Sequence, residues 1–322
     1  MEERAGALDG AMSLPLEVGL VWLLFLTVAA EMFVTYSRLP AGELYHVSHT
    51  GLAGGASRVL VFSNFSTALV ALAVLLVFVD RSRGRLLAGA AMVGVVLCAA
   101  VAWPGVVDEA NLDAKPVNAV AALGVGVALG LSALALSRQK RPVWSGRQSG
   151  DRVRVAVATV ALVLGLPWLA AELGFFLNGV PLLGWLFQTG QYRPTVSGLP
   201  PFPPAVHHGH HHGMDGLLLL LSALLLSRVV PTLRQRRLRI AVGAYLALLA
   251  CYAAGNIAND FWLEQVWKRH WTSWQIPDVL RPGATVAWGV ILLAAVALYL
   301  ASSWWLARGS DTRGEGGLLL DA

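Results

Sequence analysis

One pattern of histidines and glycines occurs twice in the sequence. It reads HxxHxGxxG and covers residues 46–54 and 208–216. Residues three positions apart share a face of an α-helix, so both imidazoles of an HxxH segment point to one place if the segment begins a helix. The four histidines are His46, His49, His208 and His211. Because imidazole is a ligand for zinc, iron and copper, the pattern predicts two metal-binding half-sites.

A glutamate precedes each pattern at the end of an apolar stretch. Glu31 and Glu172 each follow two alanines, and a proline comes nine residues later in both cases. Helices that carry glutamate and histidine build dimetal sites inside helical bundles. We therefore predict Glu31 and Glu172 as the catalytic groups, either bound to the metal or acting as a base through one water. The alternative is that both are interfacial acids that accept hydrogen bonds from loop groups.

A dense histidine cluster precedes the sixth apolar stretch. Only twelve uncharged residues separate Asp215 from Arg228, which is about 18 Å of helix and too short for a hydrocarbon core of about 30 Å. The helix is therefore predicted to start earlier and to carry four polar residues on one stripe, namely His208, His211, His212 and Asp215. The complete set of predicted metal ligands is His46, His49, His208, His211, His212 and Asp215. The alternative for this cluster is a solvated loop with adventitious metal affinity.

The composition decides what kind of element must position these groups. The chain has 322 residues, of which 56% are hydrophobic and 13% are charged, and its mean hydropathy is +0.62. A soluble domain has about 25% charged residues. A water-soluble globule, a disordered chain and a nucleic-acid-binding protein are therefore excluded, despite the net charge of +5. Both cysteines lie inside apolar runs, which excludes a disulfide framework, and the lipid bilayer is the predicted partner.

Eight nearly charge-free stretches are long enough to cross a membrane. They cover residues 18–36, 59–79, 86–107, 117–137, 155–177, 208–230, 240–259 and 284–307. We predict an all-α polytopic membrane protein with eight transmembrane helices. The side that holds the N-terminus collects 17 of the 24 basic residues, and this excess of positive charge makes it cytoplasmic. Both termini are then cytoplasmic, and the histidine-rich loops of this multi-pass cell-membrane protein are extracytoplasmic.

The order of these features predicts an internal duplication. Each half contains a glutamate, then an HxxH pattern, then a cysteine with an aspartate about ten residues later. We expect a parallel 4+4 repeat, in which residues 1–150 and 151–322 form two four-helix units related by an axis along the membrane normal. The second unit carries an insertion, the proline-rich outer loop 178–206.

Four polar residues near the ends of the predicted helices have no assigned role. They are Asp108, Asp113, Asp260 and His270. The last of them lies in residues 261–274, which we predict to form an amphipathic helix at the membrane interface, because three tryptophans recur there at helical spacing.

Three classes of function fit these features. The first is a membrane metalloenzyme that uses metal-activated water or dioxygen at the outer face, with zinc, iron or copper and an unidentified small-molecule or lipid substrate. The second is a non-catalytic metal or haem holder, such as an assembly subunit, whose paired histidines would be axial ligands. The third is a cation or proton transporter. The polar residues inside the spans gather in the outer half, which favours a one-sided site and ranks the metalloenzyme first.

Overall fold

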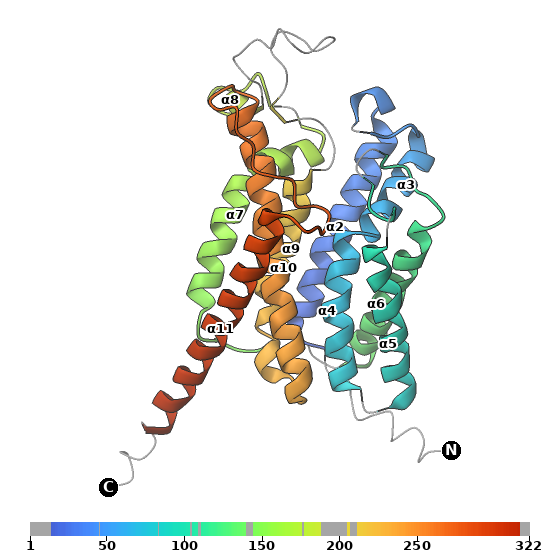
Figure 1. The fold of residues 1–322 in the computed structure, drawn as a ribbon. Coiled ribbons are helices and arrows are strands. Elements are labelled where there is room, and N and C mark those ends of the chain that lie inside the picture. Colours follow the sequence, from blue (N-terminus) through green and yellow to red (C-terminus); the bar gives the residue numbers. More distant parts are fainter. Residues whose placement is uncertain are drawn as a thin grey trace.

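The structure, a computed structural model, describes residues 14–44, 46–82, 84–103, 105–108, 111–139, 144–175, 177–187, 205–206 and 211–315. This part of the chain is mostly helical, and its longer helices pack side by side as a bundle (Figure 1). The longer helices are α2 (Leu16–Arg38), α3 (Gly51–Ser63), α4 (Ser66–Arg81), α5 (Arg85–Ala99), α6 (Asn118–Arg138), α7 (Asp151–Glu172), α9 (His212–Ser227), α10 (Arg236–Trp262) and α11 (Val286–Glu315). The short α8 (Gly184–Phe187), three 3-10 turns and a π-helical turn at Leu263–Trp267 complete the described elements.

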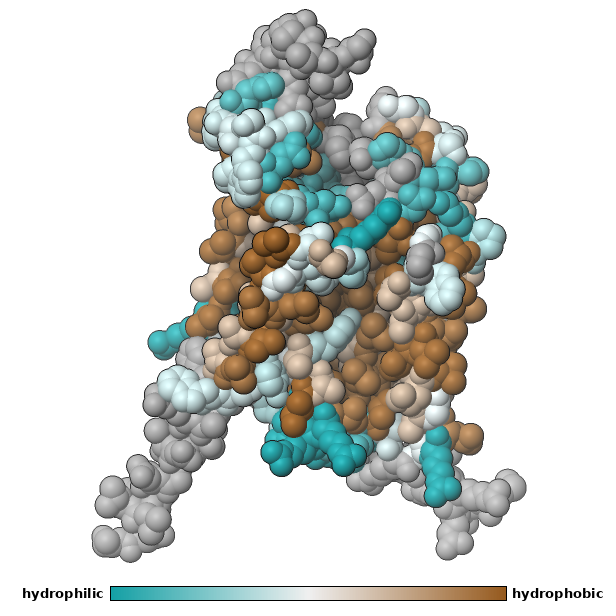
Figure 2. Space-filling view, in the orientation of Figure 1, coloured by the Kyte–Doolittle hydropathy of each residue, from teal (hydrophilic) through white to brown (hydrophobic). Residues whose placement is uncertain are grey.

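The described helices are compatible with the membrane character that the composition predicts. Seven of the described helices are long and apolar enough to cross a membrane, and the number rises to eight if α3 and α4 together form one span. Figure 2 shows the corresponding apolar belt around the middle of the bundle, with hydrophilic residues gathered towards its two ends. The first residues of α2 and the last residues of α11 lie at the same end of the bundle (Figure 1).

The predicted second span, residues 59–79, is not one straight helix. It is broken between α3 and α4, which meet at an angle of 46° around Asn64 and Phe65. Four polar residues, Ser63, Asn64, Ser66 and Thr67, interrupt the apolar run at the break, but the mean hydropathy over the length of a membrane span averages over them. Irregular backbone at membrane depth is tolerated where protein covers it or where it lines a cavity.

The bundle has a buried centre and a peripheral helix. Helix α9 packs against α10, α7, α4 and α2, and 72% of its most apolar window is buried. By contrast, α11 packs mainly on α10, and only 11% of its window is buried, so most of its surface is left for lipid. The central position of α9 places its N-terminal residues among groups from both halves of the chain.

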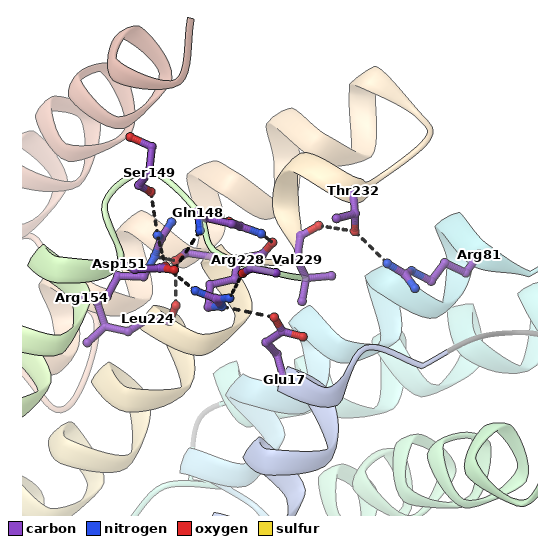
Figure 3. A network of polar contacts seen from close by, with 12 residues as sticks. Glu17, Arg81, Gln148, Ser149, Asp151, Arg154, Leu224, Arg228, Val229 and Thr232 are labelled. Atoms are coloured by element: carbon purple, nitrogen blue, oxygen red, sulfur yellow. Dashed lines mark hydrogen bonds and ion pairs between the residues drawn. The ribbon is translucent and has the colours of Figure 1, made fainter. Parts of the chain in front are cut away.

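A polar network ties the two halves together at the end of the bundle where α2 begins (Figure 3). Arg228, at the end of α9, lies 3.2 Å from Glu17 of α2 and also pairs with Asp151, the first residue of α7. Glu17 is completely buried, so this ion pair is shielded from solvent. Removing one partner of such a pair leaves a buried charge uncompensated, which makes the network a strong constraint on how α2, α7 and α9 pack.

The end of the seventh span also differs from the prediction. Helix α10 does not stop near residue 259 but continues to Trp262 and through the π-helical turn to Trp267. The chain then turns, with His270 at a positive φ of 60°. The predicted amphipathic helix over residues 261–274 is therefore wrong. Trp274 instead folds back so that its ring contacts that of Trp262 edge-on.

Candidate metal centre

His211 is the residue that immediately precedes α9. Its backbone is extended, with φ of −113° and ψ of 152°, and its carbonyl accepts the first hydrogen bond of the helix from Asp215. The helix therefore begins at His212, and the predicted helical stripe through the histidines and Asp215 is wrong for His211. The side chain of His211 is buried and faces α10.

Two carboxylates lie next to this imidazole, one from α10 and one from the π-helical turn that continues it. His211 Nδ1 is 2.9 Å from Glu264 Oε1 and 3.8 Å from Asp260 Oδ2. The ligand atoms of all three residues lie within 4.8 Å of one another, and all three side chains are buried. In a tetrahedral zinc site with bonds of about 2.1 Å, ligand atoms lie about 3.4 Å apart. The three groups are therefore spaced closely enough to share one ion after small adjustments.

Each carboxylate is oriented by a further hydrogen bond. The indole Nε1 of Trp168, in α7, donates to Glu264 Oε2 at 2.6 Å, and the backbone N–H of Gly213 donates to Asp260 Oδ2 at 2.7 Å. Gly213 also lets α9 approach α7, because a Cβ at this position would lie 2.3 Å from the Trp168 ring. Such outer contacts fix the orientation of metal-binding carboxylates in known sites.

The charge balance of this cluster favours a cation. Two ionised carboxylates and one imidazole leave at least one negative charge uncompensated, whatever the protonation of His211. Burying such a charge costs several kcal/mol unless protons or a cation neutralise it. Histidine and carboxylate ligands suit zinc, iron, manganese and copper(II), so the cluster has the donor chemistry of a transition-metal site.

The first HxxH segment lies in a different setting. His46 and His49 both precede α3, which begins only at Gly51, and His46 has a positive φ of 48°. The prediction that these two imidazoles share a helix face is therefore wrong. The His49 side chain is 60% exposed, and its Nδ1 lies 3.0 Å from Asp113 Oδ1 in the loop before α6.

The contacts in this loop lower the pKa of Asp113. Partial burial raises the pKa of Asp113, but hydrogen bonds from Ser48 and His49 together with the charge of His49 outweigh burial and lower the pKa below its usual value. Asp113 thus holds the exposed side chain of His49 in this loop. Among the described residues, no further ligand joins this pair to make a group that could bind a metal.

The two predicted catalytic glutamates, Glu31 and Glu172, lie where the ends of α2 and α7 meet, and neither belongs to the cluster around His211. Thr35 Oγ1 is 2.5 Å from Glu31 Oε1 and 2.9 Å from the backbone carbonyl oxygen of Glu172, so the ends of α2 and α7 meet here. Glu172 is buried and Glu31 is half-buried. Neither belongs to the described group of possible ligands, so a catalytic role for either remains a prediction.

The remaining predicted ligands do not belong to this group of three or lie outside the described residues. His212 and Asp215 line a cavity together with Asp108 and residues of α3. His208 lies outside the described residues. His270, which had no assigned role, is exposed and lies in the turn after α10.

Sequence reasoning missed Glu264 and left Asp260 without a role. These two residues are four apart, which is one helical turn, and this spacing was the signal available. The prediction ended the seventh span at residue 259 and began a separate interfacial helix at residue 261. The two acids were therefore not expected to share one helix. Their proximity to His211 depends on the packing of α9 against α10, which no local pattern reveals.

Comparison with known proteins adds no family. No protein-family model, no curated protein and no solved structure matches the chain. The class of the protein therefore rests on its own features: a helical bundle with seven or eight candidate membrane spans and a buried His/Asp/Glu cluster near one end.

Proposed function

We propose that this chain is a multi-pass membrane protein that binds a divalent transition-metal ion through His211, Asp260 and Glu264. The observation that carries the proposal is the convergence of three buried ligand atoms within 4.8 Å of one another. The hydrogen bonds from Trp168 and Gly213 support it, because they orient both carboxylates toward the imidazole. Carboxylates are not axial ligands of common haem sites, so the donor set favours a bare metal ion over haem.

We place this metal at the extracytoplasmic face, with both termini in the cytoplasm. The support is the distribution of basic residues in the sequence, together with the common end of the bundle at which α2 begins and α11 ends (Figure 1). A parallel duplication of four helices accounts for the two HxxHxGxxG patterns. A reporter fused after Arg147 is expected to be cytoplasmic, and one inserted within residues 195–205 is expected to be external.

The reaction class that we favour is metal-assisted chemistry on water or dioxygen. Catalytic metal sites keep three protein ligands and leave a position for water or substrate, whereas structural sites are closed by four. Three ligands from the described residues fit the first arrangement. Metal binding is expected to strengthen with rising pH, because ligands must lose protons before they bind.

The decisive experiment measures metal binding by the full chain without a histidine tag. Elemental analysis of the purified protein identifies the bound metal, and titration of the metal-free protein with Co²⁺ reports coordination through its visible spectrum. Glu264→Gln and Asp260→Asn keep the side-chain size and remove a ligand charge. Each is expected to weaken binding about a hundredfold or more, since loss of an outer contact alone costs about 10–100-fold.

The matched control is His49→Ala, which removes a histidine that is exposed and paired with one aspartate. This variant is expected to bind Co²⁺ with unchanged affinity and spectrum. Wild-type affinity in both carboxylate variants would overturn the proposal. Equal losses in these variants and in His49→Ala would show nonspecific binding by exposed histidines.

A further inference from the structure

Three buried arginines, Arg58, Arg228 and Arg269, differ in the partners that surround their guanidinium groups. Arg228 has two carboxylate partners, Glu17 and Asp151, as Figure 3 shows. Its guanidinium also donates to the Gly146 carbonyl and lies 4.4 Å from the centre of the Trp144 ring. A buried guanidinium in this protein can therefore receive a full set of partners.

Arg269 is buried with a different set of partners. Its guanidinium lies 3.8 Å from the centre of the Trp185 ring, donates to Gln265 Oε1 at 2.8 Å and also donates to the Trp185 carbonyl oxygen. Although it has no described carboxylate partner, two acceptors and an aromatic face compensate for the loss of water around it.

Arg58, in α3, has neither arrangement. Only 5% of this residue is exposed, yet within the described ranges it makes no hydrogen bond and no ion pair. Its described partner is the Tyr36 ring, whose centre is 5.6 Å from the guanidinium carbon, and its Nε, like that of Arg269, is buried without an acceptor. A buried cation with so few partners is costly unless a ligand completes its surroundings.

The guanidinium lines a small cavity at the break between α3 and α4. The cavity has a volume of about 40 Å³, and its polar lining consists of Arg58, Asn64, Asp108, His212 and Asp215. Asn64 is completely buried, and its Oδ1 has no hydrogen-bond partner among the described residues. His212 is half-buried, but its Nδ1 atom is buried and also has no described hydrogen-bond partner. One water needs about 10–15 Å³ on this measure, so the cavity has room for a small ion with one water.

Arg58 has no ion-pair partner among the described charged residues that line the cavity. Asp108 pairs with Lys115, and Arg281 lies 3.9 Å from its other oxygen. Asp215 lies in the first turn of α9, where the positive end of the helix dipole stabilises a carboxylate. Asp108 thus has described cationic partners, while the guanidinium of Arg58 has no described counter-ion.

We propose that this cavity binds one small monovalent anion, of the size of chloride, formate or bicarbonate, with Arg58 as its charge partner. A guanidinium presents several N–H donors to such an anion and stays charged at every physiological pH. A cavity volume of about 40 Å³ suits an anion of this size better than a phosphate ester or a larger organic acid. The inference involves none of the three proposed metal ligands and does not depend on the metal.

The test measures anion binding by the full-length protein in detergent, starting from a sodium gluconate buffer without small anions. Addition of sodium chloride, formate or bicarbonate is expected to raise the midpoint of thermal unfolding by about 2–4 °C at saturation. Arg58→Gln is expected to abolish the shift. The control Arg85→Gln, which changes an exposed arginine at the start of α5, is expected to keep it.

A direct measurement covers the case in which Arg58→Gln does not fold. Binding of radioactive chloride to the wild-type protein is expected to saturate at one ion per chain and to be displaced by formate. No saturable binding of chloride, or an equal thermal shift in both arginine variants, would overturn the proposal. A shift that follows sodium instead of the anion and disappears in Asp215→Asn would identify a cation site and overturn it as well.

Discussion

The two HxxHxGxxG segments are identical in pattern but not in surroundings. In the first, His49 is 60% exposed, lies in a loop before α3 and contacts Asp113 of another loop. In the second, His211 is buried at the start of α9 and faces two carboxylates, Asp260 of α10 and Glu264 of the π-helical turn after it. The difference teaches that the pattern marks where a helix begins, while the neighbouring helix decides what the histidine can do.

The physical origin of the difference lies in how far the neighbouring helix extends. Helix α10 continues past the level at which α9 starts and brings Asp260 and Glu264 alongside His211. In the first half, α3 packs mainly against α2, and the acid beside His49, Asp113, lies in the loop before α6. An exposed loop pair contributes little to stability, whereas a buried cluster must be fully satisfied.

The largest expected effect comes from removing each histidine in turn. His211→Ala leaves two buried carboxylates without their imidazole and is expected to lower the free energy of unfolding by about 3–5 kcal/mol. His49→Ala is expected to lower it by at most about 1 kcal/mol, since its pair is exposed. Unfolding of both purified variants in the same detergent measures the contrast, and equal losses would remove the distinction between the two segments.

The second glycine of each pattern, Gly54 and Gly216, is expected to behave alike where the histidines differ. A Cβ at Gly54 would lie 2.6 Å from the His49 carbonyl oxygen, and one at Gly216 would lie 2.7 Å from the Ala253 carbonyl oxygen. Gly54→Ala and Gly216→Ala are each expected to cost about 1–3 kcal/mol through overpacking. Gly126→Ala is the control, because nothing lies within 4 Å of its Cβ position. A tolerated change at either motif glycine would contradict the close packing there.

A smaller effect is expected from the indole that orients Glu264. Trp168→Phe removes the hydrogen bond from Nε1 and is expected to weaken Co²⁺ binding about 10–100-fold while most of the packing is kept. The matched control is Trp22→Phe, because that buried indole donates to Ser132 at 2.8 Å and lies far along the chain from the cluster. If both variants bound Co²⁺ with the affinity of the wild type, Trp168 would have no part in the site.

The smallest expected effect concerns the loop contact of the first segment. Because the pKa of Asp113 is lowered in the folded protein, its contribution to stability is present above the ordinary carboxyl pKa of about 3.9 and is lost as the pH falls through the lower folded value. Asp113→Asn is expected to cost less than about 1 kcal/mol at pH 7. The difference between wild type and variant should shrink below pH 4, and a difference that grew with acid would contradict the assignment.

Much of the architecture could be predicted from the sequence, because hydropathy and length are local properties. All eight predicted spans overlap described helices, with one of them divided between α3 and α4. His211 as a candidate ligand was also predictable, since it depends on a pattern near a helix start. The break at Asn64 and the extension of α10 to Trp267 were not, because burial against other helices overrides local preference there.

The sequence by itself determined that the chain is an apolar helical protein and identified His211 as a candidate metal ligand. Only the tertiary structure decided that Asp260 and Glu264, rather than Glu31 and Glu172, lie beside His211, and that Arg58 and His212 line one cavity. The reason is physical. Composition sets which stretches leave water, but the contacts of a helix end depend on the height and rotation of its neighbours, and these follow from packing over the whole bundle.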